Sequence, residues 1–255
     1  MDLMVLGSGT VAPSAERTAP AHWVQTGNTR LLLDCGSGVL HRAASFEVPW
    51  HQVTHVALTH FHPDHWCELP MLLFALRWGI EPARAAPLTV IGPAGLKTRL
   101  TLLAGALGDW VLEPGYPLRL HEIAPAESFE LAPGVVLETC KTPHTPESLA
   151  FAVRDHSARL VYTGDTGPDV SLAAWARGCT LLLAECSLPE ERALAIHLTA
   201  AQAGTLARDA GAGRLVLTHF YPSVEGTDPA ERAAQVFNGP VTAARDGDRF
   251  TVGVD

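Results

Sequence analysis

Hydrophobic and polar positions along the chain follow two patterns. Short apolar runs rich in β-branched residues predict strands, and stretches with apolar residues three or four positions apart predict helices. Strands followed by helices in both halves of the chain are typical of an α/β protein. The predicted strands cover residues 2–6, 22–26, 29–33, 56–58, 87–92, 118–123, 128–131, 135–142, 149–154, 159–163, 180–185, 214–218, 241–244 and 249–252. The predicted helices cover residues 37–46, 66–78, 96–107, 170–177, 199–209 and 229–237.

One predicted helix, residues 66–78, is apolar around its whole circumference. Its apolar residues include Leu69, Met71, Phe74 and Leu76. A helix with this composition is expected to be buried on most sides. The alternative is that its outer face contacts a second subunit, in which case the protein is a homodimer.

Composition limits the class of protein. The 255 residues are 47% hydrophobic and 18% charged, which suits one large α/β domain spanning residues 1–255. A net charge of −9 and a pI of about 5.7 argue against a broad basic surface for nucleic acid. Five cysteines without a C-x-x-C pair make disulfides unexpected, so a reducing cytoplasm is the expected location. No apolar run reaches the ~20 residues that a membrane span needs.

The segment that follows the predicted strand 56–58 carries the strongest chemical signal. It reads H-x-H-x-D-H and offers His60, His62, Asp64 and His65 as metal ligands. The two histidines before the proline point to one side of the chain, and the two residues after it can face a second point in space. A histidine-rich surface loop is the alternative, but such loops rarely carry an aspartate in this register.

Three further polar residues stand where predicted strands end. They are His144, Asp165 and His219, which follow the strands 135–142, 159–163 and 214–218. A single residue of this kind is more often a turn residue than a ligand. Three in series after the H-x-H-x-D-H segment predict a site for two metal ions, because catalytic metal sites collect ligands from several strand ends.

This series of segments resembles the metallo-β-lactamase superfamily, and within it the ribonuclease Z-like branch. The resemblance implies an αββα sandwich, two mixed sheets flanked by helices, with the metals at one edge. It also implies that Asp34 is a partner behind the metal ligands, although the sequence allows a simple turn residue there. The likeness lies in residues 6–10, 33–38, 59–65, 163–166, 184–186, 197–200 and 217–220.

The predicted ligands divide into two sets that share one carboxylate. Asp165 is expected to bridge, because its two oxygens can hold ions ~3.5–4 Å apart. Imidazole with carboxylate suits Zn²⁺, with manganese or iron as substitutes. A water between two such ions loses its proton near neutral pH and can attack a phosphorus or acyl centre. The first metal is assigned to His60, His62 and His144, and the second to Asp64, His65 and His219.

A further acid is needed to protonate the leaving group. Glu185 and His197 match the positions of the glutamate and histidine that serve the scissile phosphate in the ribonuclease Z-like branch. A carboxylate hydrogen-bonded to an imidazole favours its protonated form. The alternative for His197 is a residue that only precedes a helix. With Asp64, which is also a predicted ligand, these two residues are the predicted catalytic residues.

The sequence departs from ribonuclease Z at one point. Those enzymes carry a long, glycine-rich and basic arm between the third metal histidine and the bridging aspartate, and the arm grips transfer RNA. Here His144 and Asp165 are only 21 positions apart. A small phosphodiester is therefore the expected substrate, and transfer RNA is not expected. The alternatives are a hydrolase of the same fold that acts on lactones, thioesters or sulfate esters, and a non-catalytic, metal-stabilised binding domain.

Overall fold

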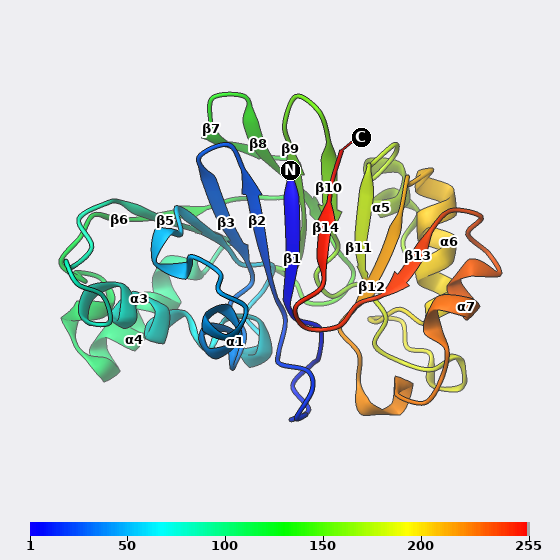
Figure 1. Cartoon of the computed structure of the whole chain (residues 1–255), viewed down its shortest axis with the longest axis horizontal. Coiled ribbons are helices and arrows are strands. Elements are labelled where there is room, and N and C mark those ends of the chain that lie inside the picture. Colours follow the sequence, from blue (N-terminus) through cyan, green and yellow to red (C-terminus); the bar gives the residue numbers. More distant parts are fainter. Residues whose placement is uncertain (254–255) are drawn as a thin grey trace.

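The computed structural model, described here for residues 1–253, consists of two seven-stranded sheets packed face to face (Figure 1). The first sheet is antiparallel on one side and parallel on the other. Its order is β14 (Arg249–Thr251), β1 (Asp2–Gly7), β2 (Ala21–Thr26), β3 (Thr29–Leu33), β4 (His55–Ala57), β5 (Leu88–Gly92) and β6 (Leu118–Glu122).

The second sheet repeats this mixture of antiparallel and parallel pairs. Parallel neighbours end at the same edge, so residues that follow them are brought together there. Its order is β13 (Val241–Ala243), β12 (Leu215–Thr218), β11 (Leu181–Glu185), β10 (Arg159–Tyr162), β9 (Leu149–Arg154), β8 (Val135–Lys141) and β7 (Ser128–Ala132).

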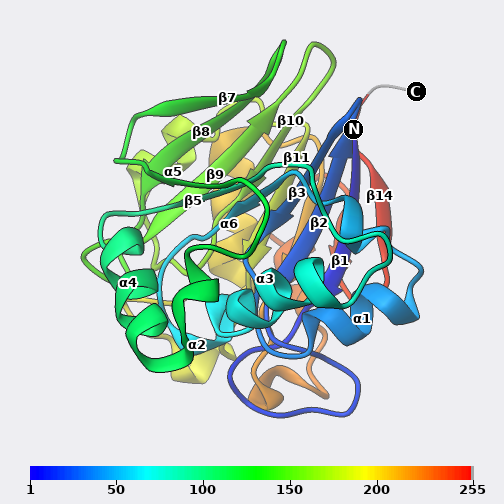
Figure 2. The same ribbon diagram turned by 90° about the vertical axis from the view of Figure 1, so that its left-hand side faces the viewer.

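Helices cover the outer face of each sheet, which gives the expected αββα sandwich. One layer lies on the first sheet, in the foreground of Figure 2, and the other lies on the second sheet. A third apolar core lies between the sheets, where Leu33 and Ala57 of one face Phe151 and Leu183 of the other. The first layer holds α1 (Val39–Ser45), α3 (Leu69–Trp78) and α4 (Leu96–Leu107); the second holds α5 (Val170–Trp175), α6 (Ala200–Ala210) and α7 (Pro229–Ala234). The shorter pieces are α2 (Pro63–Trp66), η1 (Trp50–Gln52), η2 (Asp109–Val111), η3 (Glu190–Arg192) and η4 (Pro222–Val224).

The strands and helices fall where the hydrophobic pattern predicts them, with one correction. The predicted helix 66–78 is two pieces, because Cys35, two residues after β3, accepts a hydrogen bond from the Glu68 amide and donates one to the His65 carbonyl. These contacts from another segment interrupt the helix, and Pro70 lies in the first turn of the new one. Burial of this helix is confirmed for one face only, because Met71, Phe74 and Trp78 on the other face are 58%, 41% and 66% exposed.

The connection between β13 and β14, which joins the two sheets, is hydrogen-bonded to the loop after β1. The carboxylate of Asp246, between β13 and β14, accepts hydrogen bonds from the amide and hydroxyl of Ser8 and from the amide of Thr18. It also pairs with Arg42 of α1 at 3.1 Å. The carbonyl of Ser8 in turn accepts from the Phe220 amide, directly after β12. The loop after β1 is thus held by residues more than 200 positions later in the sequence.

Within residues 1–253, no helix combines the length and the apolar character needed to cross a membrane.

Candidate metal centre

The H-x-H-x-D-H segment leaves the first sheet at the end of β4. His60 and His62 lie on the extended chain, and Pro63 then opens the single helical turn α2, which carries Asp64 and His65. Gly36 is essential to this path, because a Cβ atom at that position would lie 2.0 Å from the Asp64 carbonyl oxygen. The backbone after β3 therefore approaches the segment more closely than any side chain allows.

The second sheet supplies the other three predicted ligands from its own strand ends. His144 lies in the loop after β8, Asp165 in the loop after β10 and His219 directly after β12. His219 has a φ of 60°, a left-handed conformation that is uncommon for a residue with a side chain. Backbone strain of this kind concentrates at functional sites.

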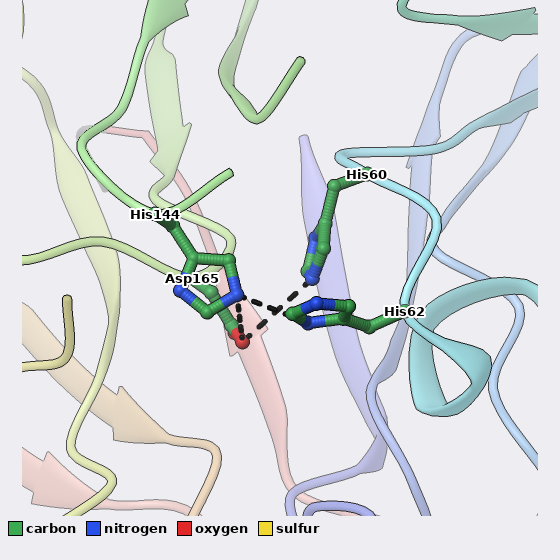
Figure 3. Close-up of side chains that lie close together, drawn as sticks. All are labelled: His60, His62, His144 and Asp165. Atoms are coloured by element: carbon green, nitrogen blue, oxygen red, sulfur yellow. Dashed lines mark hydrogen bonds and ion pairs between the residues drawn. The ribbon is translucent and has the colours of Figure 1, made fainter. Parts of the chain in front are cut away.

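All seven predicted ligands converge at one edge of the sandwich, around Asp165. Its Oδ2 atom lies 3.8 Å from His60 Nε2 and 3.4 Å from His144 Nε2 (Figure 3). Its Oδ1 atom lies 3.3 Å from both His65 Nε2 and His219 Nε2. Each carboxylate oxygen therefore faces a different pair of imidazoles, which is the arrangement expected of a bridging ligand.

His62 and Asp64 complete the two groups. The Nδ1 atom of His62 lies 3.1 Å from the Nε2 atom of His144, on the Oδ2 side of Asp165. The Oδ2 atom of Asp64 lies 3.7 Å from His219 Nε2 and 3.9 Å from His65 Nε2, on the other side. These are two of the clusters of possible ligand atoms, and a third joins Asp165 and His219 with His197, so the division of the ligands between two metals stays a prediction.

The free atoms of the cluster fit divalent cations. Within residues 1–253, the Nε2 atoms of His60, His65 and His219 and the Oδ1 atom of Asp165 are buried without a hydrogen-bond partner. Unpaired buried polar atoms are rare in proteins, and four that face one another indicate a missing charge at their centre. Imidazole nitrogens and carboxylate oxygens grouped in this way are donors that could hold divalent metal.

The opposite ring nitrogens of the histidines are held in place by other groups. Four Nδ1 atoms contact oxygen atoms: that of His60 contacts Thr59 Oγ1 at 3.0 Å, that of His65 contacts Asp34 Oδ2 at 2.8 Å, that of His144 contacts the Ile196 carbonyl at 3.1 Å, and that of His219 contacts Ser187 Oγ at 2.8 Å. Such contacts fix the ring and direct the Nε2 lone pair to the metal.

Asp34 is located behind the ligands, as the resemblance implied. Besides His65, its carboxylate accepts hydrogen bonds from the Thr59 amide at 2.7 Å, the Thr59 hydroxyl at 2.9 Å and the Tyr162 hydroxyl at 2.8 Å. Thr59 lies in the segment 59–65 that carries the family likeness, whereas Tyr162 lies in no such segment and its contact with Asp34 was not predicted.

The charges of the cluster suit metal binding. Burial alone would raise the pKa of Asp165, but the facing imidazoles of His219 and His65 hold that pKa well below its usual range. Burial and the neighbouring His65 keep the pKa of His60 well below its usual value, so its lone pair is free. His65 differs: burial lowers its pKa, but Asp165 and Asp34 on its two sides raise it more. A cation must therefore displace a proton from this ring.

Glu185 and His197 meet beside the cluster. His197 Nδ1 lies 3.1 Å from both oxygens of the Glu185 carboxylate, which ends β11. Burial alone would lower the pKa of His197, but the hydrogen bonds and charge of Glu185 raise it. The ring of His197 lies 4.8 Å from that of His144, so this pair adjoins the predicted metal ligands.

Comparison with known proteins places this geometry in a family. Residues 29–220 match the sequence pattern of a Beta-lactamase superfamily domain. The chain belongs to the β-lactamase superfamily. Ribonuclease Z of Mycobacterium bovis (strain BCG / Pasteur 1173P2) is 30% identical over 276 aligned positions, which cover 99% of this chain and 98% of that protein. Within the superfamily, the chain is a metallo-β-lactamase protein of the ribonuclease Z-like branch.

Solved structures share this fold. The metallo-beta-lactamase fold protein YhfI from Bacillus subtilis superposes with a TM-score of 0.85 at 26% identity, over 98% of both chains. The short form of human tRNase Z superposes with a TM-score of 0.82 at 23% identity, over 100% of both chains. The expected αββα fold and the expected class, a metal-dependent hydrolase of the phosphodiesterase type, are confirmed.

The expectation that transfer RNA is not a substrate is not confirmed. It rested on the short connection between His144 and Asp165 and on the acidic charge of the chain, yet the alignment with a relative named ribonuclease Z covers 98% of that protein.

Proposed function

We propose that this protein is a phosphodiesterase with two divalent cations, which cleaves nucleotide-type phosphodiesters with His197 as the acid for the leaving oxygen. The proposal rests on the way the two carboxylate oxygens of Asp165 face different histidines. One oxygen faces His60 and His144, and the other faces His65 and His219. A single metal would not need a carboxylate shared in this way.

The residues of the chain would hold the cations and arrange the reaction around them. His60, His62 and His144 would hold one ion, Asp64, His65 and His219 the other, and Asp165 both. When bound, two such ions lower the pKa of a water and neutralise charge that develops on the phosphate. Imidazole and carboxylate donors favour Zn²⁺, with manganese or iron as substitutes.

Glu185 and His197 would complete the reaction. The carboxylate orients the imidazole through Nδ1 and keeps it protonated, so that Nε2 can donate to the leaving oxygen. Hydrolysis of lactones or thioesters has less need of an acid held so close to the metal ligands. The pair therefore supports phosphodiesters over those substrates and over sulfate esters.

The test is a panel in which the leaving group varies. The purified protein, loaded with Zn²⁺ or Mn²⁺, is assayed on bis-p-nitrophenyl phosphate, a dinucleoside phosphate, lactones, thioesters and sulfate esters. Turnover of the phosphodiesters alone supports the proposal, and turnover of the lactones or thioesters alone overturns it. His197→Ala should lower the rate of hydrolysis of the dinucleoside phosphate by ~10²-fold or more, because the leaving oxygen of this substrate needs a proton. The same change should affect bis-p-nitrophenyl phosphate much less, because p-nitrophenolate leaves without one.

RNA is the second candidate substrate. It is favoured by the ribonuclease Z of Mycobacterium bovis, which this chain matches over 98% of that protein's length. The net charge of −9 and the short connection before Asp165 favour small diesters instead. A transfer RNA precursor assayed beside the dinucleoside phosphate decides between them, with the kcat/KM ratio as the readout.

We also propose that the outer face of α3 is a contact between two subunits. Met71, Phe74 and Trp78 are 58%, 41% and 66% exposed on one helix, which makes an apolar surface. Trp78→Lys should shift the sedimentation of a dimer to that of a monomer. Val170→Lys, at an 85% exposed position on α5, is the control that should not. One domain over residues 1–255 and action in the cytoplasm stay predictions.

A further inference from the structure

Ser187 lies between the predicted metal ligands and the predicted acid pair, and the sequence analysis assigned it no role. The residue follows β11 by two positions and is fully buried. Its hydroxyl oxygen contacts both the Glu185 Oε2 atom and, at 2.8 Å, the Nδ1 atom of His219. No other described side chain hydrogen-bonds to both residues.

Hydrogen-bond chemistry gives this contact a direction. An ionised carboxylate only accepts, so the single hydroxyl proton of Ser187 goes to Glu185. The serine oxygen can then only accept from His219, whose Nδ1 atom must carry the ring proton. The Nε2 atom of His219 is left without a proton, and it is this atom that lies 3.3 Å from Asp165 Oδ1. The serine thus selects the tautomer of His219 that binds a cation.

The same hydrogen bond fixes the carboxylate that orients His197. Glu185 Oε2 accepts from Ser187 and from the Leu198 amide at 3.2 Å, and Oε1 accepts from the Thr166 amide at 2.6 Å. With both oxygens held, the carboxylate presents a fixed edge to His197 Nδ1, 3.1 Å from each.

We propose that Ser187 is a positioning residue that couples the metal ligand His219 to the Glu185–His197 pair through one hydroxyl group. The inference rests on the proposed function, because it takes His219 as a ligand and His197 as the acid. Two consequences follow from one atom: loss of the hydroxyl weakens the hold of His219 on the cation, and it loosens the orientation of His197.

The experiment measures both consequences separately. Zn²⁺ affinity is determined by competition with a chromophoric chelator, which needs no turnover, and kcat and KM are measured on a dinucleoside phosphate at saturating Zn²⁺. Ser187→Ala should weaken Zn²⁺ binding on the order of 10-fold, as found for partners behind metal ligands. It should also lower kcat with little change in KM. Ser187→Thr, which restores the hydroxyl, should recover both.

Two controls make the result specific. Ser171 also bonds through its hydroxyl to an acid two residues earlier, Asp169, at 2.7 Å on the exposed start of α5, so Ser171→Ala should change neither quantity. In a His197→Ala background, Ser187→Ala should lower kcat no further, because the two changes remove the same contribution. It should still weaken Zn²⁺ binding in that background.

Three outcomes would overturn the inference. They are an unchanged Zn²⁺ affinity in Ser187→Ala, an unchanged kcat at saturating Zn²⁺, or additive losses of kcat in the double variant. If the unaltered protein hydrolyses no phosphodiester, the proposed function fails. The chelator competition still tests the link to His219 in that case, so the two failures are distinguishable.

Discussion

Replacement of Asp34 by asparagine tests whether the buried carboxylate behind the metal ligands organises the centre. The side chain is fully buried and accepts hydrogen bonds from the amide and hydroxyl of Thr59, from His65 and from Tyr162. An amide of the same shape cannot accept them all. If the asparagine NH₂ group takes the place of Oδ1, it faces the Thr59 amide, which is also a donor. If it takes the place of Oδ2, it faces the other three donors.

The size of the effect follows from these contacts. The less harmful orientation leaves one buried amide unpaired, at a cost of about 1–3 kcal/mol. The three remaining hydrogen bonds lose a charged acceptor, which makes each about half as strong. We therefore expect Asp34→Asn to lower the free energy of unfolding of the metal-free protein by roughly 2–4 kcal/mol. Because His65 is no longer held, Zn²⁺ affinity should fall about 10- to 100-fold.

Urea unfolding in the presence of a chelator measures the first effect, and chelator competition measures the second. Asp209→Asn is the matched control, because that carboxylate is exposed and pairs only with its neighbour Arg208. The reasoning is refuted if Asp34→Asn unfolds at the same urea concentration as the unaltered protein and binds Zn²⁺ equally well.

Three further predictions concern close packing, pH and metal removal. Gly36→Ala should destabilise the protein by about 1–3 kcal/mol, because the added Cβ atom would overlap the Asp64 carbonyl oxygen. Gly105→Ala, with open space around it, is the control that should not destabilise it, and thermal unfolding of both variants measures the difference. Burial would raise the pKa of Asp155, but hydrogen bonds, the strongest from Thr26, lower it to about 2, so this carboxylate stabilises the fold above about pH 4 and that contribution is lost as the pH falls through about 2. Unfolding of Asp155→Asn should accordingly show a weaker dependence on pH in this range than the unaltered protein, and an equal dependence would contradict the assignment. Chelation should abolish hydrolysis and lower the melting temperature, with both restored by added Zn²⁺ or Mn²⁺, whereas full activity after exhaustive chelation would rule out metal dependence.

Local sequence patterns predicted most of the architecture, because the spacing of apolar residues along the chain differs between strands and helices. Strands such as β10 and β12 are apolar, end abruptly and are followed by Asp165 and His219, so both the elements and the ligands were visible in the sequence. The break between α2 and α3 was not visible, because hydrogen bonds from Cys35, in the segment after β3, cause it. Pro70 was a usable signal, since proline is favoured in the first turn of a helix.

The groups that support the ligands were the hardest to predict. Ser187 acts through one hydroxyl between Glu185 and His219, and serine is common in loops without such a role. Tyr162 looked like the last apolar residue of a strand, yet its hydroxyl reaches Asp34 from the other sheet. Which polar atoms meet across two sheets depends on how those sheets dock, and no single segment contains that information.

The hydrogen bonds between the β13–β14 connection and the loop after β1 have a consequence for truncation of the chain. The Asp246 carboxylate accepts a hydrogen bond from Ser8, and the Ser8 carbonyl accepts one from the backbone amide that follows His219. A loop near the start of the chain therefore depends on a residue near its end. Without β14 the edge of β1 has no neighbour on that side, and without Asp246 the loop that contacts the Phe220 amide loses its hydrogen bonds to that carboxylate. We therefore expect removal of residues 245–253 to disturb the backbone beside His219 as well as to take a strand from the first sheet.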